Sequence, residues 1–304
     1  TNATEEFTAA GLSIGAWTTG TALNTARYDG AGTGTREAAM FVGGNDASAA
    51  DALNEIWNGT SWTESADINT ARWELAAAGP TTSALVTGGR TPATPNVSGN
   101  AEIWNGSAWT ETTDLGTPRK KGQMTGTDSE ATLYFGGIDV PNNRRGYTEN
   151  WNGSSWTEVA DLNTARSAFG SAGAGNPASL AFGGYTGTAY SAASESWNGS
   201  AWTETNDLNQ SRAVNAGIGA TSTSALYAGG YSPSAPNNYV ALTEDWNGAS
   251  WVEVADLNTA RGNNAASGTA SAGFVFSGEH PSGGVTTSSE EWSGNTITTK
   301  VLTD

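Results

Sequence analysis

Residues 195–204 read ESWNGSAWTE, and close variants of this stretch recur along the whole chain. The first tryptophan of each copy is Trp57, Trp104, Trp151, Trp197, Trp246 or Trp292, so neighbouring copies are 46 to 49 residues apart. A period of this length is typical of repeat architectures in which each repeat forms one supersecondary unit. The fold must therefore be built from one unit that is repeated six times.

Other features keep a fixed distance from that tryptophan. A second tryptophan follows five residues later, except in the last copy, where Ile297 takes its place. An arginine follows ten residues after the second tryptophan, and Trp17 precedes Arg27 by the same offset. The six arginines of the repeat are Arg27, Arg72, Arg119, Arg166, Arg212 and Arg261. Each copy then has a short apolar run that ends in a glycine pair, such as Gly183-Gly184, or in Ser277-Gly278.

This order of elements resembles the kelch repeat: an arginine, a strand of small residues, an apolar strand ending in Gly-Gly, then an aromatic residue and a tryptophan at fixed spacing. The resemblance covers almost the whole chain and implies a β-propeller. Trp-Asn-Gly stands where the kelch family more often has Tyr-Asp, which alters a turn rather than the architecture. The copies are nearly identical in sequence, as the recurring DLNTAR of residues 161–166 shows. In this respect the chain is also similar to kelch-like proteins of marine bacteriophages.

The predicted fold is all-β, a six-bladed β-propeller of kelch-like four-stranded antiparallel blades that forms a single domain over residues 1–304. In the unit that starts at Arg166, strand a is expected at 167–173, strand b at 179–183, strand c at 192–197 and strand d from Trp202. Asn198-Gly199 joins strands c and d, and Asn-Gly supports the positive φ angles of a tight hairpin turn. The expected blades are 27–65, 72–112, 119–159, 166–205, 212–254 and 261–302, preceded by a closing segment at 1–26.

Ring closure is left open by the sequence. Residues 2–7 resemble residues 288–292, while Trp17 and residues 296–298 both look like a strand d. Two segments therefore compete for the outer edge of the last blade, unless the chain is part of a longer array. Closure itself is expected because it removes long open sheet edges.

Composition excludes several function classes. A formal net charge of −17 disfavours nucleic acid and anionic membranes as partners. No apolar run approaches the roughly 20 residues that span a bilayer, so no membrane insertion is expected. The absence of cysteine removes disulfides, thiolate metal sites and thiol nucleophiles. A galactose-oxidase-like copper site, known on the same fold, would need a Cys–Tyr crosslink and several histidines, so neither a metal nor another cofactor is predicted.

The charged residues that recur in every copy are interpreted as structural. A residue present in every blade serves a role common to all blades. We therefore expect the six arginines to form structural pairs that tie the d–a segment to a neighbouring strand; a ring of cationic ligand-binding groups is the alternative. The same structural role is expected of the recurring glutamates Glu55, Glu102, Glu149, Glu195, Glu244 and Glu290. The recurring aspartates of the Asp-Leu-Asn stretch lack the spacing of a calcium loop. We expect their carboxylates to accept backbone hydrogen bonds in the d–a turn.

Residues that differ between copies are the candidates for binding. Variation follows each glycine pair, in loops between strands b and c at 45–53, 90–100, 138–147, 185–193, 231–241 and 279–288. Variation on one face of a repeat protein is typical of a binding face. The predicted binding residues on this rim are Arg144, Arg145, Tyr147, Tyr185, Tyr190, Tyr231, Tyr239 and His280, with Trp73 and Tyr28 near the same mouth. Aromatic rings beside Asn and Arg suit sugar rings; neutral drift in solvated loops is the alternative.

Three functions are weighed. The first is a non-enzymatic binding or structural propeller on a virion, in a phage tail or fibre, or on another extracellular surface. Its expected partners are a glycan or protein on a host or cell surface, and other virion proteins. The second is a secreted bacterial lectin or adhesion domain. The third is a polysaccharide-acting enzyme in which Asp29 and Glu74 pair across the central mouth, which requires carboxylates about 5–10 Å apart.

Overall fold

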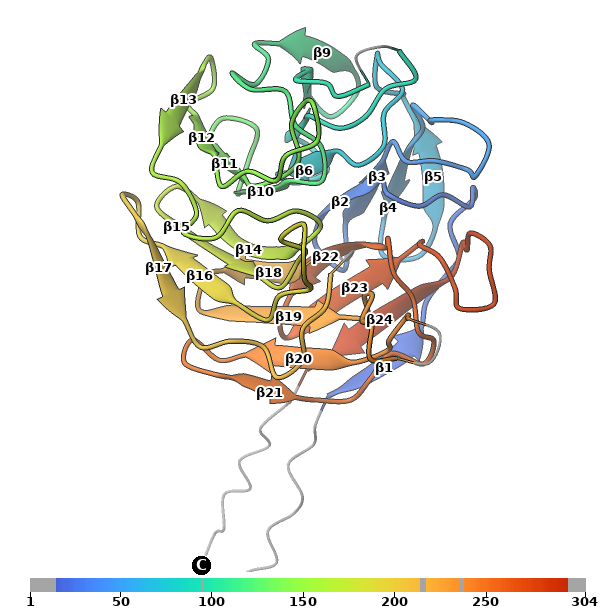
Figure 1. Cartoon of the computed structure of the whole chain (residues 1–304). Coiled ribbons are helices and arrows are strands. Elements are labelled where there is room, and N and C mark those ends of the chain that lie inside the picture. Colours follow the sequence, from blue (N-terminus) through green and yellow to red (C-terminus); the bar gives the residue numbers. More distant parts are fainter. Residues whose placement is uncertain (1–14, 94–95, 214–216, 236–237, 295–304) are drawn as a thin grey trace, which may run out of the picture.

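The computed structural model describes residues 15–93, 96–213, 217–235 and 238–294. These residues form 24 strands in six four-stranded antiparallel sheets. The sheets stand around a common axis like the blades of a propeller (Figure 1). The predicted six-bladed β-propeller is therefore confirmed. In the part of the chain that is described, no helix is long and apolar enough to cross a membrane.

Each blade has its strands in the order a to d from the axis outwards. The a strands are β2 (Ala31–Gly34), β6 (Ala76–Ala78), β10 (Gln123–Gly126), β14 (Gly170–Gly175), β18 (Gly217–Thr221) and β22 (Ala265–Thr269). The b strands are β3 (Ala39–Val42), β7 (Ala84–Thr87), β11 (Thr132–Phe135), β15 (Ala178–Phe182), β19 (Ser224–Ala228) and β23 (Ala272–Phe276). The c strands are β4 (Asn54–Trp57), β8 (Ala101–Trp104), β12 (Thr148–Trp151), β16 (Ser194–Trp197), β20 (Thr243–Trp246) and β24 (Ser289–Ser293). The d strands are β5 (Trp62–Ser65), β9 (Trp109–Thr112), β13 (Trp156–Val159), β17 (Trp202–Thr205), β21 (Trp251–Glu253) and β1 (Ala16–Thr19).

Blades are numbered by their a strands, so blade 1 begins at β2 and blade 6 at β22. Strand a of blade 4 begins at Gly170 rather than at the expected residue 167. The cause is local: Ser167 forms an isolated bridge with Tyr185, and Ala168 has a φ of 52°, which no strand residue adopts. The residues that follow the repeat arginine therefore belong to the rim and not to the blade.

Residue size follows the distance from the axis. Strands a carry small residues because neighbouring a strands approach closely: a Cβ on Gly217 of blade 5 would lie 2.2 Å from the carbonyl oxygen of Ser171 in blade 4. Tryptophans fill the wider space outside, where Trp197 and Trp202 pair across strands c and d with ring centroids 5.5 Å apart. These rings pack against Phe135 of blade 3, so the apolar core lies between blades.

The repeat arginines are buried structural ties. The side chain of Arg166 is fully buried and donates from Nη2 to Oε1 of Glu195 at 2.6 Å. Its Nη1 donates to the carbonyl oxygens of Gly183 and Ala193. Oε2 of Glu195 accepts the backbone N–H of Asn163 at 2.7 Å. The equivalent pairs are Arg27–Glu55, Arg72–Glu102, Arg119–Glu149, Arg212–Glu244 and Arg261–Glu290.

Recurring polar residues close the turns. Oδ1 of Asn198 accepts the backbone N–H groups of Ser200 and Ala201, both at 3.0 Å. Only Gly199 in this loop has a positive φ, of 94°. The c–d connection is thus a four-residue loop closed by an asparagine side chain, and the predicted positive φ angle is found at the glycine but not at the asparagine. Asp207 accepts the backbone N–H of Ser194 at the start of strand c, and not one within the d–a turn as predicted, because the carboxylate faces the neighbouring strand of its own blade.

The ring is closed by the N-terminal strand. β1 pairs with β24, which places Trp17 opposite Trp292 with ring centroids 5.3 Å apart. Nε1 of Trp17 donates to Oγ1 of Thr243 in blade 5 at 3.1 Å. The other segments weighed for this role, residues 2–7 and 296–298, lie outside the described residues.

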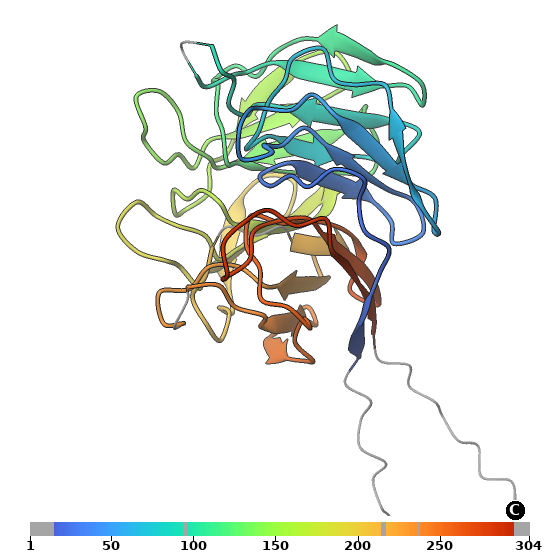
Figure 2. The same cartoon turned by 90° about the vertical axis from the view of Figure 1, so that its right-hand side faces the viewer.

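The described ends of the chain lie on one face, away from the long loops (Figure 2). At this face the backbone N–H of Gly294 donates to the carbonyl oxygen of Ser271, in the turn between β22 and β23. The b–c loops emerge on the opposite face (Figure 2). That face is therefore left free by both described ends.

Candidate functional site

The rim that bears the b–c loops is built to one plan in all six blades. In blade 4, Tyr185 forms backbone bridges with Ser167 on one side and Tyr190 on the other. Each blade has the same double bridge, which joins the residue after the arginine, the residue after the glycine pair and a residue of the b–c loop. The last two positions are occupied, blade by blade, by Asn45 and Ala50, Arg90 and Val97, Ile138 and Arg144, Tyr185 and Tyr190, Tyr231 and Tyr239, and Glu279 and Val285. A constant frame thus presents side chains that vary around the ring.

Blades 4 and 5 present tyrosine at both positions, and the four rings are continuous. Tyr185 and Tyr190 have ring centroids 5.2 Å apart. Tyr190 stacks on Tyr231 of the next blade at 5.5 Å with 28° between the ring planes, and Tyr231 meets Tyr239 edge-on at 5.6 Å. All four are half-buried, so each still offers ring surface to solvent. We call Tyr185, Tyr190, Tyr231 and Tyr239 the tyrosine row.

Polar groups stand at both ends of the tyrosine row. The guanidinium carbon of Arg144, from blade 3, lies 5.2 Å from the ring centroid of Tyr185. At the other end the hydroxyl of Tyr239 donates to Oε2 of Glu279 in blade 6 at 3.2 Å. Burial, and then the neighbouring Glu279 carboxylate, raise the pKa of Tyr239 to about 12. Tyr239 therefore remains uncharged at neutral pH and keeps donating to this carboxylate.

The remaining predicted rim residues lie outside this row. Arg145 stacks on Tyr147 at 5.1 Å and pairs with Asp139. Trp73 stacks with Arg90 at 5.1 Å.

Tyr28 and His280 complete the predicted set. The backbone of Tyr28 bridges Asn45 in blade 1. His280 lies in the b–c loop of blade 6, where burial lowers its pKa. Of the ten predicted binding residues, the structure brings Arg144 and the four residues of the tyrosine row together.

A belt of backbone hydrogen bonds, which no sequence pattern predicted, joins neighbouring blades at the channel mouth in the described part of the chain. Its five described members each lie two residues after a repeat arginine and share φ angles of 52–58°: Asp29, Glu74, Lys121, Ala168 and Asn263. The backbone N–H of Glu74 donates to the carbonyl oxygen of Asp29, that of Lys121 to Glu74, that of Ala168 to Lys121, and that of Asp29 to Asn263. Each bond links one blade to the next. The fixed offset from the arginine was the available signal, but the left-handed conformation was not predictable because these residues are not glycines.

The belt holds charged side chains over the channel. The carboxylate of Glu74 forms ion pairs with Nζ of Lys120 at 3.1 Å and with Nζ of Lys121 at 3.2 Å. Burial, reinforced by the nearby Glu74 carboxylate and opposed by Lys121, raises the pKa of Asp29 to about 6. The two carboxylates weighed as a catalytic pair thus lie in adjacent blades on one mouth, and Glu74 is engaged by two ammonium groups.

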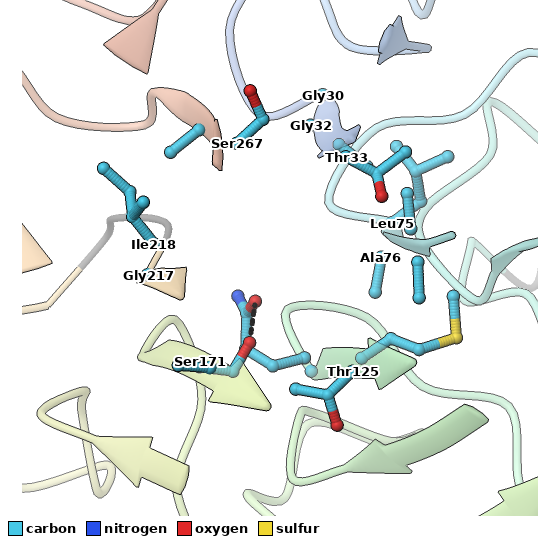
Figure 3. Close-up of a pocket in the computed structure, with 18 of the residues that line it drawn as sticks. Gly30, Gly32, Thr33, Leu75, Ala76, Thr125, Ser171, Gly217, Ile218 and Ser267 are labelled. Atoms are coloured by element: carbon cyan, nitrogen blue, oxygen red, sulfur yellow. Dashed lines mark hydrogen bonds between the residues drawn. The ribbon is translucent and has the colours of Figure 1, made fainter. Parts of the chain in front are cut away.

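Below the belt the channel holds a cavity of about 160 Å³ (Figure 3). Its walls are the small residues of the a strands, with side-chain hydroxyls such as those of Thr33, Thr125 and Ser171. Oγ of Ser171 donates to Oε1 of Gln123 at 3.3 Å. Within the described ranges, no group of three or more His, Cys, Asp or Glu side chains is placed to hold a metal ion. The cavity can admit a few water molecules but is too small for a sugar chain, since ligand pockets are typically about 300 Å³ or more.

Comparison with known proteins adds no further assignment. No protein-family model matches the chain, and no curated protein matches it significantly.

Proposed function

We propose that the chain is a non-enzymatic recognition module, a kelch-like propeller that binds a glycan through the rim of blades 4 and 5. The tyrosine row carries this proposal. Four half-buried rings from two blades form one continuous aromatic surface on the face that is free of both described ends. Aromatic faces suit the apolar faces of sugar rings, and the hydroxyl edges of a sugar suit nearby hydrogen-bonding groups.

The frame beneath the row supports a binding role. Each tyrosine sits on a backbone bridge and its ring contacts another ring of the row, so main chain and ring are both held in place. Rigid presentation lowers the entropy cost of binding. The repeat arginines, by contrast, form buried ion pairs, and their side chains are not accessible to a ligand.

We place the module on an extracellular surface, and specifically on a virion, as part of a phage tail or fibre. The near-identical sequences of the repeats and the acidic, cysteine-free composition support this setting. A secreted bacterial lectin would use the same rim. Detection of the protein in purified virions would distinguish the two settings, and its absence from every particle fraction would contradict the virion assignment.

A glycan array with the 304-residue chain tests the binding proposal. The expected result is selective binding of a small group of related glycans. A parallel screen for release of reducing ends from the bound glycans tests the enzymatic alternative. Turnover that is lost in Asp29→Asn or Glu74→Gln would replace the binding proposal with a hydrolase.

A further inference from the structure

The cations of this acidic chain are distributed unevenly. Of the 13 lysines and arginines, six are the buried repeat arginines, and Lys300 lies outside the described residues. Six others remain in the described part of the chain. Arg36 lies on the face opposite the rim, next to Glu37 and the end of β24. The remaining five all lie on the rim of blades 2 and 3: Arg90, Lys120, Lys121, Arg144 and Arg145.

We call these five residues the basic sector. Only two carboxylates pair with them among the described residues: Glu74, which holds both lysines, and Asp139, which holds Arg145. Arg90 and Arg144 have no carboxylate partner there, and each guanidinium lies against an aromatic ring instead. On a chain of formal charge −17, this sector is a local reversal of the surface field.

A groove runs through the basic sector. It has a volume of about 310 Å³ and lies between the b–c loops of blades 2 and 3. Arg90 and Val97 line one wall, and Asp139 and Val140 line the other, with Lys120 between them. Val140 is 56% exposed, so the groove offers apolar contact as well as charge.

The groove and the tyrosine row belong to one continuous surface. Arg144 connects the groove and the tyrosine row. It belongs to the b–c loop of blade 3, which forms one wall of the groove, and its guanidinium lies over the ring of Tyr185. Around the rim the side chains thus change from cations in blades 2 and 3 to tyrosines in blades 4 and 5 and then to Glu279 in blade 6. A ligand lying along this surface would meet positive charge and aromatic faces in succession.

We propose that the ligand is an acidic polysaccharide, whose anionic groups bind the basic sector while neighbouring sugar rings lie on the tyrosine row. This inference rests on the proposed glycan-binding function and names the class of glycan. Guanidinium groups match carboxylate and sulfate oxygens with paired hydrogen bonds. A nucleic acid is a poorer fit because its long, dense charge would extend over the acidic remainder of the surface.

Titration calorimetry on the 304-residue chain tests this proposal with matched ligands. The probes are oligogalacturonate for the carboxylate source, dextran sulfate oligosaccharide for the sulfate source, and dextran oligosaccharide of equal length as the neutral control. We expect at least one anionic probe to bind more tightly than neutral dextran. Arg90→Gln/Arg144→Gln should weaken that binding by about a hundredfold, since a hydrogen bond to a charged group contributes about a factor of ten.

The matched control is Arg36→Gln, which removes an accessible arginine from the opposite face and should leave binding unchanged. Equal thermal unfolding midpoints for wild type and both variants would show that folding is intact. The proposal is overturned if neutral dextran binds as tightly as both anionic probes, if Arg36→Gln weakens binding as much as the double variant, or if polyglutamate binds as tightly as the anionic sugars. Neutral binding alone would leave the proposed glycan function standing, whereas binding of none of the sugars, nor of any arrayed glycan, would remove both.

Discussion

Tyr190 of blade 4 stacks on Tyr231 of blade 5 with ring centroids 5.5 Å apart. The contact joins the loops of two blades into a single surface. Tyr190 occupies the b–c loop position of the rim frame, and Tyr231 occupies the position after the glycine pair. Blades 1, 2, 3 and 6 carry aliphatic, charged or amide side chains at these two positions. The variable positions of the repeat have therefore produced an aromatic patch in one sector, while the constant positions maintain the propeller.

The buried ion pairs predict large losses of stability from a single truncation. Glu195→Ala leaves the guanidinium of Arg166 buried without its carboxylate and removes the acceptor for the backbone of Asn163. Breaking a buried pair in this way costs about 3–5 kcal/mol. Urea unfolding should show that loss. The control is Glu204→Ala, which truncates the exposed cross-strand partner of Glu195 and should change the free energy of unfolding by less than about 0.5 kcal/mol.

Closure by β1 predicts a difference between two tryptophans of the d strands. Trp17 is 6% exposed and contacts Trp292 and Thr243, whereas Trp156 is half-buried at the same position of blade 3. Trp17→Ala should lower the free energy of unfolding by about 3–5 kcal/mol, as expected for truncation of a buried tryptophan. Trp156→Ala should cost clearly less. Equal losses in a thermal or urea melt would contradict the assignment of β1 as the closing strand.

Asn264 is a polar residue at a position that blades 2 and 4 fill with apolar side chains. It is 5% exposed, and neither its amide nitrogen nor its amide oxygen has a hydrogen-bond partner among the described residues. Leu75 and Phe169 occupy the same position three residues after the repeat arginine, and both are buried. Asn264→Leu should therefore raise the free energy of unfolding by about 1–2 kcal/mol. The reverse change, Leu75→Asn, should lower it, and a stabilising Leu75→Asn would contradict this reasoning.

Asp29 predicts a pH dependence of stability. Its pKa is about 6 in the folded state against an ordinary value of 3.8, mainly because of burial. Between these values the folded chain keeps a proton that the unfolded chain has released, so stability falls as pH rises from about 4 to above 6. Asp29→Asn should remove that fall and exceed wild type by roughly 2–3 kcal/mol at pH 7.5, with no difference below pH 4. Urea unfolding at pH 7.5 and below pH 4 measures this difference in the free energy of unfolding, and the exposed Glu64→Gln serves as the control. The same difference between Asp29→Asn and wild type at the two pH values would contradict the raised pKa.

The sequence was sufficient for the architecture because the repeat encodes each blade separately. The spacing of tryptophan, arginine and glycine pairs predicted six blades, and the structure has six. It could not decide which segment closes the ring, because the environment of Trp17 depends on β24, more than 270 residues away. The belt of left-handed residues was also missed, since Asp29, Glu74 and Lys121 have no local reason to adopt a positive φ. Contacts between blades impose that conformation.

The candidate site was predictable in location but not in composition. The loops after the glycine pairs identified the rim, and Tyr185, Tyr190, Tyr231 and Tyr239 were all named from it. Their contact with one another depends on how two loops of different length are folded, which a pattern does not specify. The basic sector could have been found by subtracting the six repeat arginines from the cations. That step requires knowing that those six are buried.

The central claim is that the tyrosine row is the ligand site, and titration of the best array glycan into two variants tests it most directly. Tyr190→Ala/Tyr231→Ala removes the stacked pair at the centre of the row, while Tyr28→Ala removes a tyrosine from the same face outside it. Loss of a binding hot spot costs about 2 kcal/mol or more. The account predicts that the double variant binds at least about thirtyfold more weakly than wild type while Tyr28→Ala binds normally. Unchanged affinity in the double variant, with its unfolding midpoint preserved, would contradict the account and place the site elsewhere on the propeller.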